Sequence, residues 1–288
     1  MYKSQRIKSI RKQQTKQTLL AMRHDFNFSY IGGVNLTAKI AHGKEYGIDT
    51  YTLYFAPYKL SGQNVCAKAT KECIMGCLNT SGRVKMDKKN IIVNARTQRT
   101  IAFYEQREKF MTLMIHEISL AKKRSEKKGT IFAVRLNGTS DLSPEIFKAF
   151  GQNILELFPD VQFYDYTKVL NRKKLVEKYP NYDLTFSYTG YNWSECQQAL
   201  SDNVRVAVVF DVKRGKALPK TFNGYKVIDG DLNDYRPMDE KNVIVGLRWK
   251  DIANRENNTA IKNSPFVVKV TTENVVTTSD NVHETQTV

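Results

Sequence analysis

Three cysteines lie close together in the first third of the chain. Cys66, Cys73 and Cys77 are separated by six and then by three residues, and a fourth cysteine, Cys196, stands far from them. Thiolates are soft ligands that bind zinc and iron. A short irregular loop can fold three of them onto one ion or cluster. The spacing predicts that Cys66, Cys73 and Cys77 hold either a four-iron, four-sulfur cluster or a zinc ion.

Three ligands leave one coordination position open, and the chemistry depends on what fills it. With zinc, the fourth ligand could be Cys196, a histidine or water. With an iron–sulfur cluster, one iron would be free to bind a reactant, which makes such a cluster catalytic. The spacing differs from the paired Cys-x-x-Cys pattern of common zinc sites. The alternatives are that the three are unrelated reduced thiols and that Cys196 belongs to the hydrophobic core.

Short runs rich in Val, Ile, Phe and Tyr predict the strands that position this loop. Helical patterns fill several of the gaps: the longest covers Gln98–Lys123, and another begins at Ser143 and stops at Pro159. The cysteine loop follows the first strand run, so we expect it at the carboxyl end of that strand. The runs are Thr50–Phe55, Thr130–Leu136, Val161–Tyr166, Asp183–Ser187, Val204–Phe210, Tyr225–Ile228 and Val243–Leu247.

Strands that alternate with helices favour parallel strands joined by crossovers. We expect an α/β fold, specifically a partial (βα) barrel of about six to seven mainly parallel strands, because polar residues follow every predicted strand. An open doubly wound sheet would concentrate them at one switch point. The expected organisation is a basic N-terminal arm over residues 1–45, a barrel-like domain over 46–270 with a cysteine loop at 56–83, and a disordered tail over 271–288.

Polar side chains at the ends of the predicted strands are candidates for catalysis or ligand binding at the barrel mouth. Aspartates there could form a magnesium site or an acid–base pair, although Asp141 could instead cap a helix. Lys168 could bind phosphate or act as a base. The candidates are Arg135, Asn137, Ser140, Asp141, Asp165, Lys168 and Ser187.

The chain is strongly basic. Its 288 residues include 45 Lys and Arg against 29 Asp and Glu, which gives a formal charge of +16. This excess attracts polyanions and favours nucleic acid over an anionic membrane surface as the partner. Basic residues interleaved with aromatic and amide side chains can neutralise phosphates and stack on bases. The expected nucleic-acid-binding residues are Arg96, Arg99, Arg172, Lys173, Lys174, Arg248 and Lys250.

The sequence also bears on location. No apolar run approaches the roughly 20 residues that span a bilayer. The apolar run after the basic start, Leu19–Met22, is too short for the core of a signal peptide. We therefore expect a cytoplasmic protein without a membrane partner, in which the cysteines stay reduced. No sequence feature selects an oligomeric state.

A set of motifs in a fixed order resembles the phage family of gene-product-88-like proteins. The resemblance covers most of the chain, from Leu53 to Val268. It implies a phage protein that works inside the infected host cell. The motifs that carry it are Cys66–Arg83, Arg135–Asp141, Phe163–Lys168, Leu184–Ser187, Val206–Phe210, Val227–Asp231 and Val243–Leu247.

A more distant resemblance is to radical S-adenosylmethionine enzymes, which carry three cysteines in the loop after the first strand of a partial barrel. The topology expected here is similar, and it implies S-adenosylmethionine as a further cofactor candidate. Two features differ. Those enzymes place three and then two residues between their cysteines, and Asn137–Asp141 stands where they carry a Gly-Gly-Glu-type segment.

Three classes of function fit these observations. The first is an enzyme that acts on nucleic acid and uses the cluster for redox or radical chemistry. The second is a non-enzymatic DNA-binding or replication-associated protein in which a metal only stabilises the loop. The third is a counter-defence or interaction protein that binds a small molecule or a host factor. A fold alone does not choose among them, because one fold hosts many functions.

Overall fold

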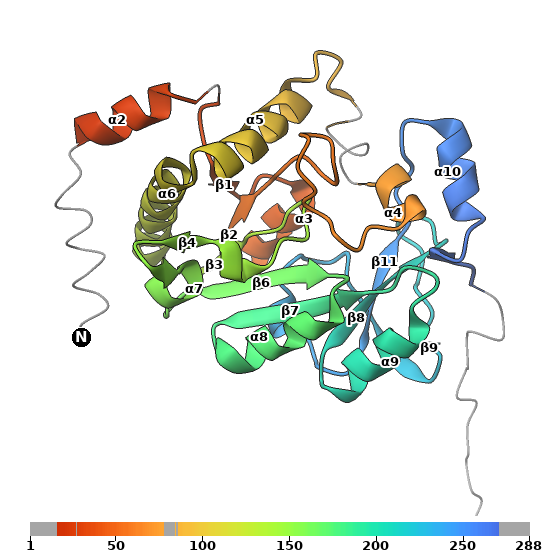
Figure 1. The fold of residues 1–288 in the computed structure, drawn as a ribbon. Coiled ribbons are helices and arrows are strands. Elements are labelled where there is room, and N and C mark those ends of the chain that lie inside the picture. The colour runs from red at the N-terminus through yellow and green to blue at the C-terminus, as the bar shows by residue number, and fades with distance from the viewer. Residues whose placement is uncertain (1–15, 27, 78–83, 85, 271–288) are drawn as a thin grey trace, which may run out of the picture.

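One sheet of ten strands organises the chain (Figure 1). The computed structural model describes residues 16–26, 28–77, 84 and 86–270. Along the sheet the strands follow the order β1-β2-β3-β6-β7-β8-β11-β10-β9, and β12 pairs with β8. The strands are β1 (Gly32–Val34), β2 (Ile48–Leu53), β3 (Ile131–Arg135), β6 (Gln162–Thr167), β7 (Tyr182–Ser187), β8 (Arg205–Phe210), β9 (Thr221–Phe222), β10 (Tyr225–Asp229), β11 (Ile244–Arg248) and β12 (Val267–Val268).

The central strands of this sheet are parallel. Every neighbouring pair from β2 to β10 is parallel, and only β1 and β9 join the path antiparallel. The strand runs rich in Val, Ile and Phe suit parallel strands that are buried on both faces. All seven predicted runs overlap observed strands, so the expected α/β fold with mainly parallel strands is confirmed. In the described part of the chain, the edge strands β1 and β9 do not pair with each other, and the sheet is open there.

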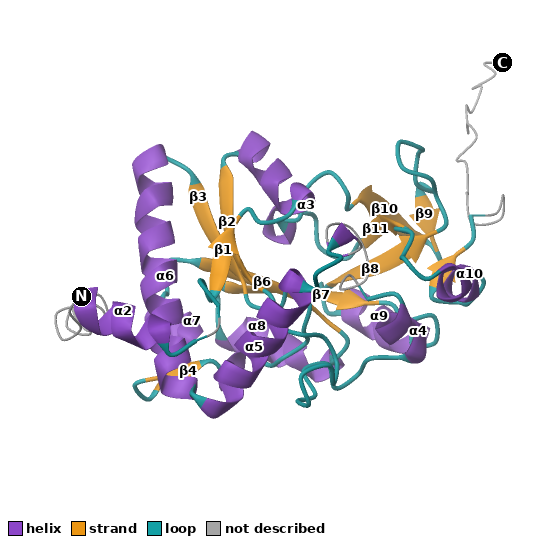
Figure 2. Cartoon of the chain, turned by 90° about the horizontal axis from the view of Figure 1, so that it is seen from above, coloured by secondary structure: helices purple, strands orange, loops and turns teal. Residues whose placement is uncertain are grey.

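Helices cover one face of the sheet, which we call the helix-covered face (Figure 2). α6 packs on β3, while α8 and α9 pack on β7 and β8. The core of this layer contains the rings of Phe55, Phe103, Phe110 and Phe147, whose centroids lie between 5.0 and 6.4 Å apart. The helices named here are α5 (Ile91–Glu105), α6 (Arg107–Lys128), α8 (Lys173–Lys178) and α9 (Trp193–Ser201).

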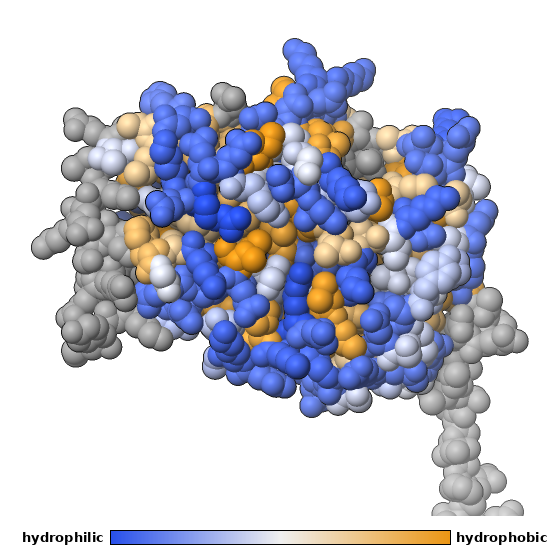
Figure 3. All heavy atoms as spheres, viewed as in Figure 1, coloured by the Kyte–Doolittle hydropathy of each residue, from blue (hydrophilic) through white to orange (hydrophobic). Residues whose placement is uncertain are grey.

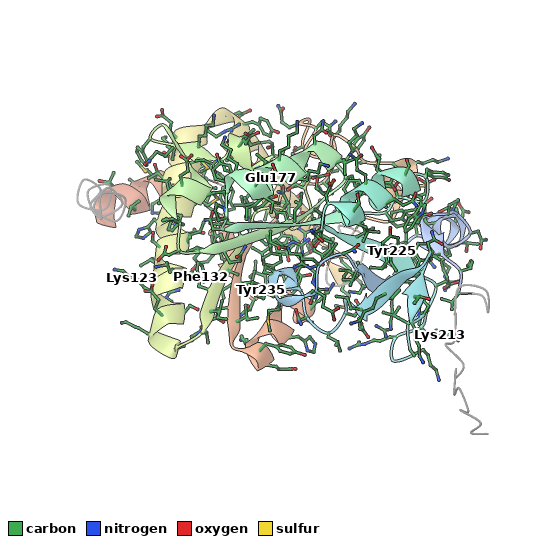
Figure 4. All side chains as sticks on the ribbon, turned by 90° about the horizontal axis from the view of Figure 1, so that it is seen from below. Lys123, Phe132, Glu177, Lys213, Tyr225 and Tyr235 are labelled. Carbon is green, nitrogen blue, oxygen red and sulfur yellow. The ribbon has the colours of Figure 1, made fainter. Side chains whose placement is uncertain are left out.

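The other face of the sheet is concave, and we call it the inner face. In Figure 2, β1 to β3 form one arm, β8, β10 and β11 form the other, and α3 (Ala38–Ala41) lies between the arms. Figure 4 shows Tyr235 on this side of the sheet, opposite to Glu177 of α8 (Lys173–Lys178). Side chains alternate along a strand. The register therefore puts Thr52, Arg135, Tyr166 and Thr185 together on the inner face.

The helix predicted from Ser143 is wrong. The segment begins with a short 3-10 helix, η4 (Pro144–Ile146), and continues as the hairpin β4 (Lys148–Ala149) and β5 (Gln152–Asn153) before α7 (Ile154–Leu157). Phe150 and Gly151 have φ angles of 52° and 72°, in the left-handed region that reverses the chain and cannot continue a helix. The hairpin and α7 bury the apolar residues of this segment, and the spacing of those residues happens to resemble that of a helix.

The N-terminal part of the chain contributes to the sheet. Glu117 of α6 accepts hydrogen bonds from the backbone N–H groups of Ile31 and Gly32, each at 3.2 Å, and from the Tyr51 hydroxyl at 2.9 Å. These bonds fix the start of β1 beside β2, after helix α2 (Lys16–His24). The first 15 residues of the predicted arm and the predicted tail over 271–288 lie outside the described residues. None of the described helices is long and apolar enough to cross a membrane.

Candidate functional site

Cys66 lies in the loop that follows β2, at the carboxyl edge of the parallel strands. Its Sγ accepts a hydrogen bond from the Tyr58 N–H at 3.4 Å and lies 3.9 Å from the Thr139 carbonyl oxygen. The loop is fastened to the segment after β3, because the Asp141 N–H donates to the Val65 carbonyl at 2.8 Å. The structure therefore puts Cys66 at the carboxyl end of the first parallel strand, as the sequence predicted, and also beside the segment after β3.

Cys73 lies on the short helix α4 (Lys71–Met75), and Cys77 follows it. Thr70 caps α4 by accepting a hydrogen bond from the Cys73 N–H at 3.3 Å. A Cβ atom on Gly76 would lie only 3.1 Å from Trp249 and 3.3 Å from Ile261, so α4 packs tightly against the far arm of the sheet. Figure 1 shows α4 beside α10 (Arg255–Lys262) and near β11. The cysteine loop thus crosses the carboxyl edge from one arm to the other.

The three thiols lie close enough to influence one another. The pKa of Cys66 is raised to about 11, chiefly by burial and also by the charges of Cys77 and Cys73, against the opposing effect of the Tyr58 N–H. For Lys168, burial favours the neutral amine, but Cys73, Asp141 and Cys66 outweigh it and raise the pKa of the ammonium group. The Lys168 side chain also forms a hydrogen bond with Cys73. Cys66, Cys73 and Lys168, the residue that follows β6, therefore share one electrostatic environment.

The metal assignment stays a prediction. Among residues 16–26, 28–77, 84 and 86–270, no three His, Cys, Asp or Glu side chains lie in an arrangement that could hold one ion. Cys196 lies apart from the loop, fully buried on α9, and burial raises the pKa of its thiol to about 12. It packs with the core that includes Phe186 and Phe210. Of the two alternatives for Cys196, its position favours the core thiol over the fourth ligand.

Solvent reaches the inner face at its carboxyl end, beneath the cysteine loop. On five neighbouring strands, the inner-face residue nearest the carboxyl end is partly exposed. Thr52 and Thr185 also point to the inner face, but they lie farther from this end and are fully buried. We call this end of the inner face the opening. It is formed by Arg135, Tyr166, Ser187, Val209 and Leu247.

Asp141 joins the ends of β3 and β6. Its carboxylate accepts hydrogen bonds from the Thr167 hydroxyl at 2.8 Å and the Lys168 N–H at 2.9 Å, and it forms a buried ion pair with Arg172. Arg172 also donates to the Asp141 carbonyl oxygen at 2.6 Å. Asp141 and Arg172 are both buried. Asp141 therefore fixes the backbone of Lys168, the residue whose side chain meets Cys73.

Asn137, Ser140 and Asp165 form a second buried network at the same edge. The Asn137 N–H and side-chain amide donate to the two Asp165 oxygens at 2.8 and 3.0 Å, and the Ser140 hydroxyl donates to Asn137 Oδ1 at 2.7 Å. The Tyr182 hydroxyl lies 3.5 Å from Asp165. By strand alternation, Asp165 points to the helix-covered face, opposite to Tyr166. Burial raises the pKa of Asp165 to about 7, against the opposing effect of Arg135 and of the Asn137 donors.

We expect this carboxyl to make stability depend on pH. An aspartate whose pKa is raised on folding binds more protons in the folded state, so the free energy of unfolding should fall as pH rises from about 4 to about 7. Asp165→Asn should flatten that fall. It should also cost about 1 to 2 kcal/mol at pH 8, because the new amide would face the Asn137 amide. Urea titrations of both proteins at several pH values measure this. If the free energy of unfolding fell equally with pH in the wild type and in Asp165→Asn, the pH dependence would belong to other groups.

The predicted mouth residues therefore form two groups on opposite sides of the sheet. Arg135 belongs to the inner face, where it pairs with Asp234 at 2.6 Å and its guanidinium lies 4.8 Å from the Tyr166 ring centroid. Ser187 ends β7 at the opening. The other candidates lie in the Asp141 and Asp165 networks at the strand ends. Whether any of them is catalytic stays a prediction.

Most of the predicted nucleic-acid-binding residues have partners within the protein. Lys173 forms an ion pair with Asp202, and the Arg99 guanidinium donates to the Tyr30 carbonyl at 2.8 Å. Lys174 is exposed. The remaining contacts are Arg172 with Asp141, Arg248 with Asp229 and Asp231, Lys250 with Asp231 at 3.8 Å, and Arg96 over the Tyr54 ring at 5.0 Å. Their role in binding nucleic acid stays a prediction.

Sequence reasoning missed several polar residues of the inner face. Thr52 and Thr185 have buried hydroxyls, and Arg236 has a buried Nε; none of these has a hydrogen-bond partner among the described residues. Arg236 lies on η6 (Arg236–Met238), after β10. The signal for the threonines was present in the strands, where Thr alternates with large apolar residues and so marks one polar face. Nothing in the sequence around Arg236 pointed to burial.

Comparison with known proteins gives a family and no closer relative. No curated protein and no solved structure matches the chain significantly. The family model described as Gene product 88 matches residues 10–264, which includes the cysteine loop, both arms of the sheet and the opening. Since this match covers most of the chain, the protein is a member of the Gene product 88 family.

Proposed function

We propose that the protein is an iron–sulfur enzyme built on a partial barrel, with the cluster held by Cys66, Cys73 and Cys77 over the opening of the inner face. The observation that supports this proposal is that the cysteines of one loop act electrostatically on one another and on Lys168 at the carboxyl edge of the parallel strands. In barrel enzymes this edge is where chemistry takes place. When bound, a cluster with three thiolates supplies electron transfer and one iron that is open to a reactant.

The surroundings of the thiols support a cluster more than a single zinc ion. Four ligands on one zinc would place sulfur atoms about 3.8 Å apart, given Zn–S bonds near 2.3 Å. A cluster binds each thiolate through a different iron, so its sulfurs are farther apart. The described cysteines influence one another electrostatically without forming a single-ion group. Lys168 and Arg96, which interact with Cys73 and Cys77, would balance the negative charge of a thiolate-bound cluster.

The protein's own residues would prepare the site for a reactant. Asp141 holds the Lys168 backbone, so that the ammonium group stays beside Cys73. Arg135 and Tyr166 face the opening and could orient a substrate below the cluster. S-adenosylmethionine is a co-substrate to test in this arrangement.

Nucleic acid is the proposed substrate, on the basis of charge. Figure 3 shows hydrophilic side chains over much of one face. Lys213, Arg214, Lys216 and Lys220 are exposed in the segment after β8, and Arg214 acts electrostatically on Lys250. A second candidate, DNA binding with a structural metal, rests on the same charges. A third, capture of a small molecule or host factor, would need neither redox activity nor DNA affinity.

Metal and sulfide analysis with an absorption spectrum, on protein purified without oxygen, tests the proposal. We expect about four iron and four sulfide per chain. The Cys73→Ser variant should lose them, and Cys196→Ala, the matched control in the core, should keep them. About one zinc together with steeply salt-dependent DNA binding would support the second candidate. Neither metal in the wild-type protein would contradict both metal proposals.

A further inference from the structure

We propose that the inner face, below the opening, binds a small anionic molecule that carries a phosphate or carboxylate group. Five buried donor groups without hydrogen-bond partners gather on this face, within the described part of the chain. They are the hydroxyls of Thr52, Thr185 and Tyr166 and the Nε atoms of Arg135 and Arg236. This inference adds a small-molecule ligand to the proposed enzyme and rests on that proposal for the reaction, although the site itself involves no cysteine.

The donors come from neighbouring strands in matching positions. Thr52 on β2 is paired in register with Arg135 on β3, and Tyr166 on β6 with Thr185 on β7. The Arg135 guanidinium stacks over the Tyr166 ring, so the two pairs adjoin. Arg236 approaches the same ring from η6, close enough to lower the otherwise raised pKa of Tyr166. The five donors thus face one region between the arms of the sheet.

A buried polar group without a partner costs stability. Thr52 and Thr185 are 0% exposed and Arg236 is 1% exposed, so bulk water does not satisfy them. These five groups can all donate: they are two threonine hydroxyls, one tyrosine hydroxyl and two guanidinium N–H groups. The nearby acceptor Asp239 Oδ2 is held in an ion pair with Arg236. A site made of donors and positive charge matches the oxygens of an anion.

The charges around this region support the same ligand. Arg135 and Lys39 share one carboxylate, Asp234, at 2.6 and 3.6 Å. Arg236 is paired with Asp239 at 2.9 Å. Burial lowers the pKa of Lys39, and the neighbouring Arg236 and Arg135 lower it further, although Asp234 and Asp231 oppose them. Lys39, Arg135 and Arg236 thus bring three cationic side chains to this region beside Asp234 and Asp239, and an anion could contact them.

Threonine-to-valine variants test the proposal, because they remove a hydroxyl and keep the shape. The probes are inorganic phosphate, pyrophosphate and malonate, each compared with chloride at equal ionic strength by thermal unfolding and calorimetric titration. We expect at least one probe to raise the Tm of the wild-type protein. Thr185→Val should raise the Tm of the free protein by about 2 °C, because an unsatisfied hydroxyl is gone. The same variant should bind the probe about 10-fold more weakly.

Two further variants keep the test decisive. Thr100→Val is the matched control: Thr100 is equally buried, but its hydroxyl accepts from the Ala56 N–H and donates to the Arg96 carbonyl, both at 2.9 Å. It should lower the Tm and leave probe affinity unchanged. Cys73→Ser should keep probe binding, which separates this inference from the cluster. If no probe exceeds chloride, or if Thr185→Val binds as the wild type does, the inference is overturned. Comparing the affinities for phosphate and malonate shows whether the site prefers a phosphate or a carboxylate group.

Discussion

Asp141→Ala is expected to lower the free energy of unfolding by about 3 to 5 kcal/mol, as when one member of a buried ion pair is removed. The variant leaves Arg172 buried without its carboxylate, and it removes the acceptor of the Thr167 hydroxyl and the Lys168 N–H. The end of β6 then loses its link to the segment after β3. Because Lys168 meets Cys73, we also expect a lower iron content in the purified variant than in the wild-type protein.

Urea unfolding and iron analysis of the same preparation measure both effects. Lys173→Ala is a suitable control, since Lys173 is next in sequence to Arg172 but its ion pair with Asp202 is partly exposed. Such pairs contribute about 0 to 1 kcal/mol. The stability of Asp141→Asn should lie between those of Asp141→Ala and Lys173→Ala, because an amide oxygen can still accept one of the hydrogen bonds. A variant Asp141→Ala as stable as Lys173→Ala would show that the buried pair does not hold the strand ends together.

Arg205→Met should destabilise the protein to a similar extent, about 3 to 5 kcal/mol. The guanidinium is completely buried and pairs with Asp183 at 2.6 Å. It also donates to the backbone carbonyl oxygens of Asp239 at 3.0 and 3.2 Å and of Glu240 at 3.0 Å. Methionine fills a comparable volume but satisfies none of these acceptors. The loss should also loosen the segment that carries Arg236 on the inner face.

A second substitution separates charge from packing. In Arg205→Met combined with Asp183→Leu, the buried carboxylate is removed as well, and its other partner, Lys241, is exposed enough to be solvated. We expect the double variant to be more stable than the single one, and the difference measured by urea unfolding is the penalty of a buried aspartate that has lost Arg205 and keeps only Lys241. Lys226→Ala, which breaks the exposed pair with Glu240, is the control with little expected effect. A double variant less stable than Arg205→Met would contradict this charge argument and would assign the lost stability to packing.

The parallel sheet and the place of the cysteine loop could be predicted because their signals are local. Runs such as Val204–Phe210 are short and rich in β-branched residues, which favours a buried strand over a helix, and the cysteine loop is the next segment after the first run. The segment after Ser143 shows the limit of this reasoning. Its apolar spacing suited a helix, but left-handed residues at Phe150 and Gly151 make a hairpin. Backbone handedness at one position is decided by tertiary packing, which a periodic pattern does not encode.

Among the polar residues of the site, too, some positions could be predicted from the sequence and others could not. That Asp165 and Tyr166 point to opposite faces follows from strand alternation, so their separation could have been predicted from the sequence. That Asp234 and Arg236 return to Arg135 from about 100 residues later in the chain could not. Contacts over such separations depend on how the arms of the sheet curve, and the curvature is set by the whole sheet rather than by any one strand.

The contact of Gly76 with Trp249 and Ile261 has a consequence for biosynthesis. The surface on which α4 rests is made by residues that leave the ribosome long after Cys77. Until then the described part of the cysteine loop can attach to the first arm and to Lys168 but lacks the surface under α4. Joining segments so distant in the chain is a slow step of folding. Acquisition of a metal at this loop would therefore be post-translational in timing, and a chain truncated before α10 would expose the three thiols to oxidation instead.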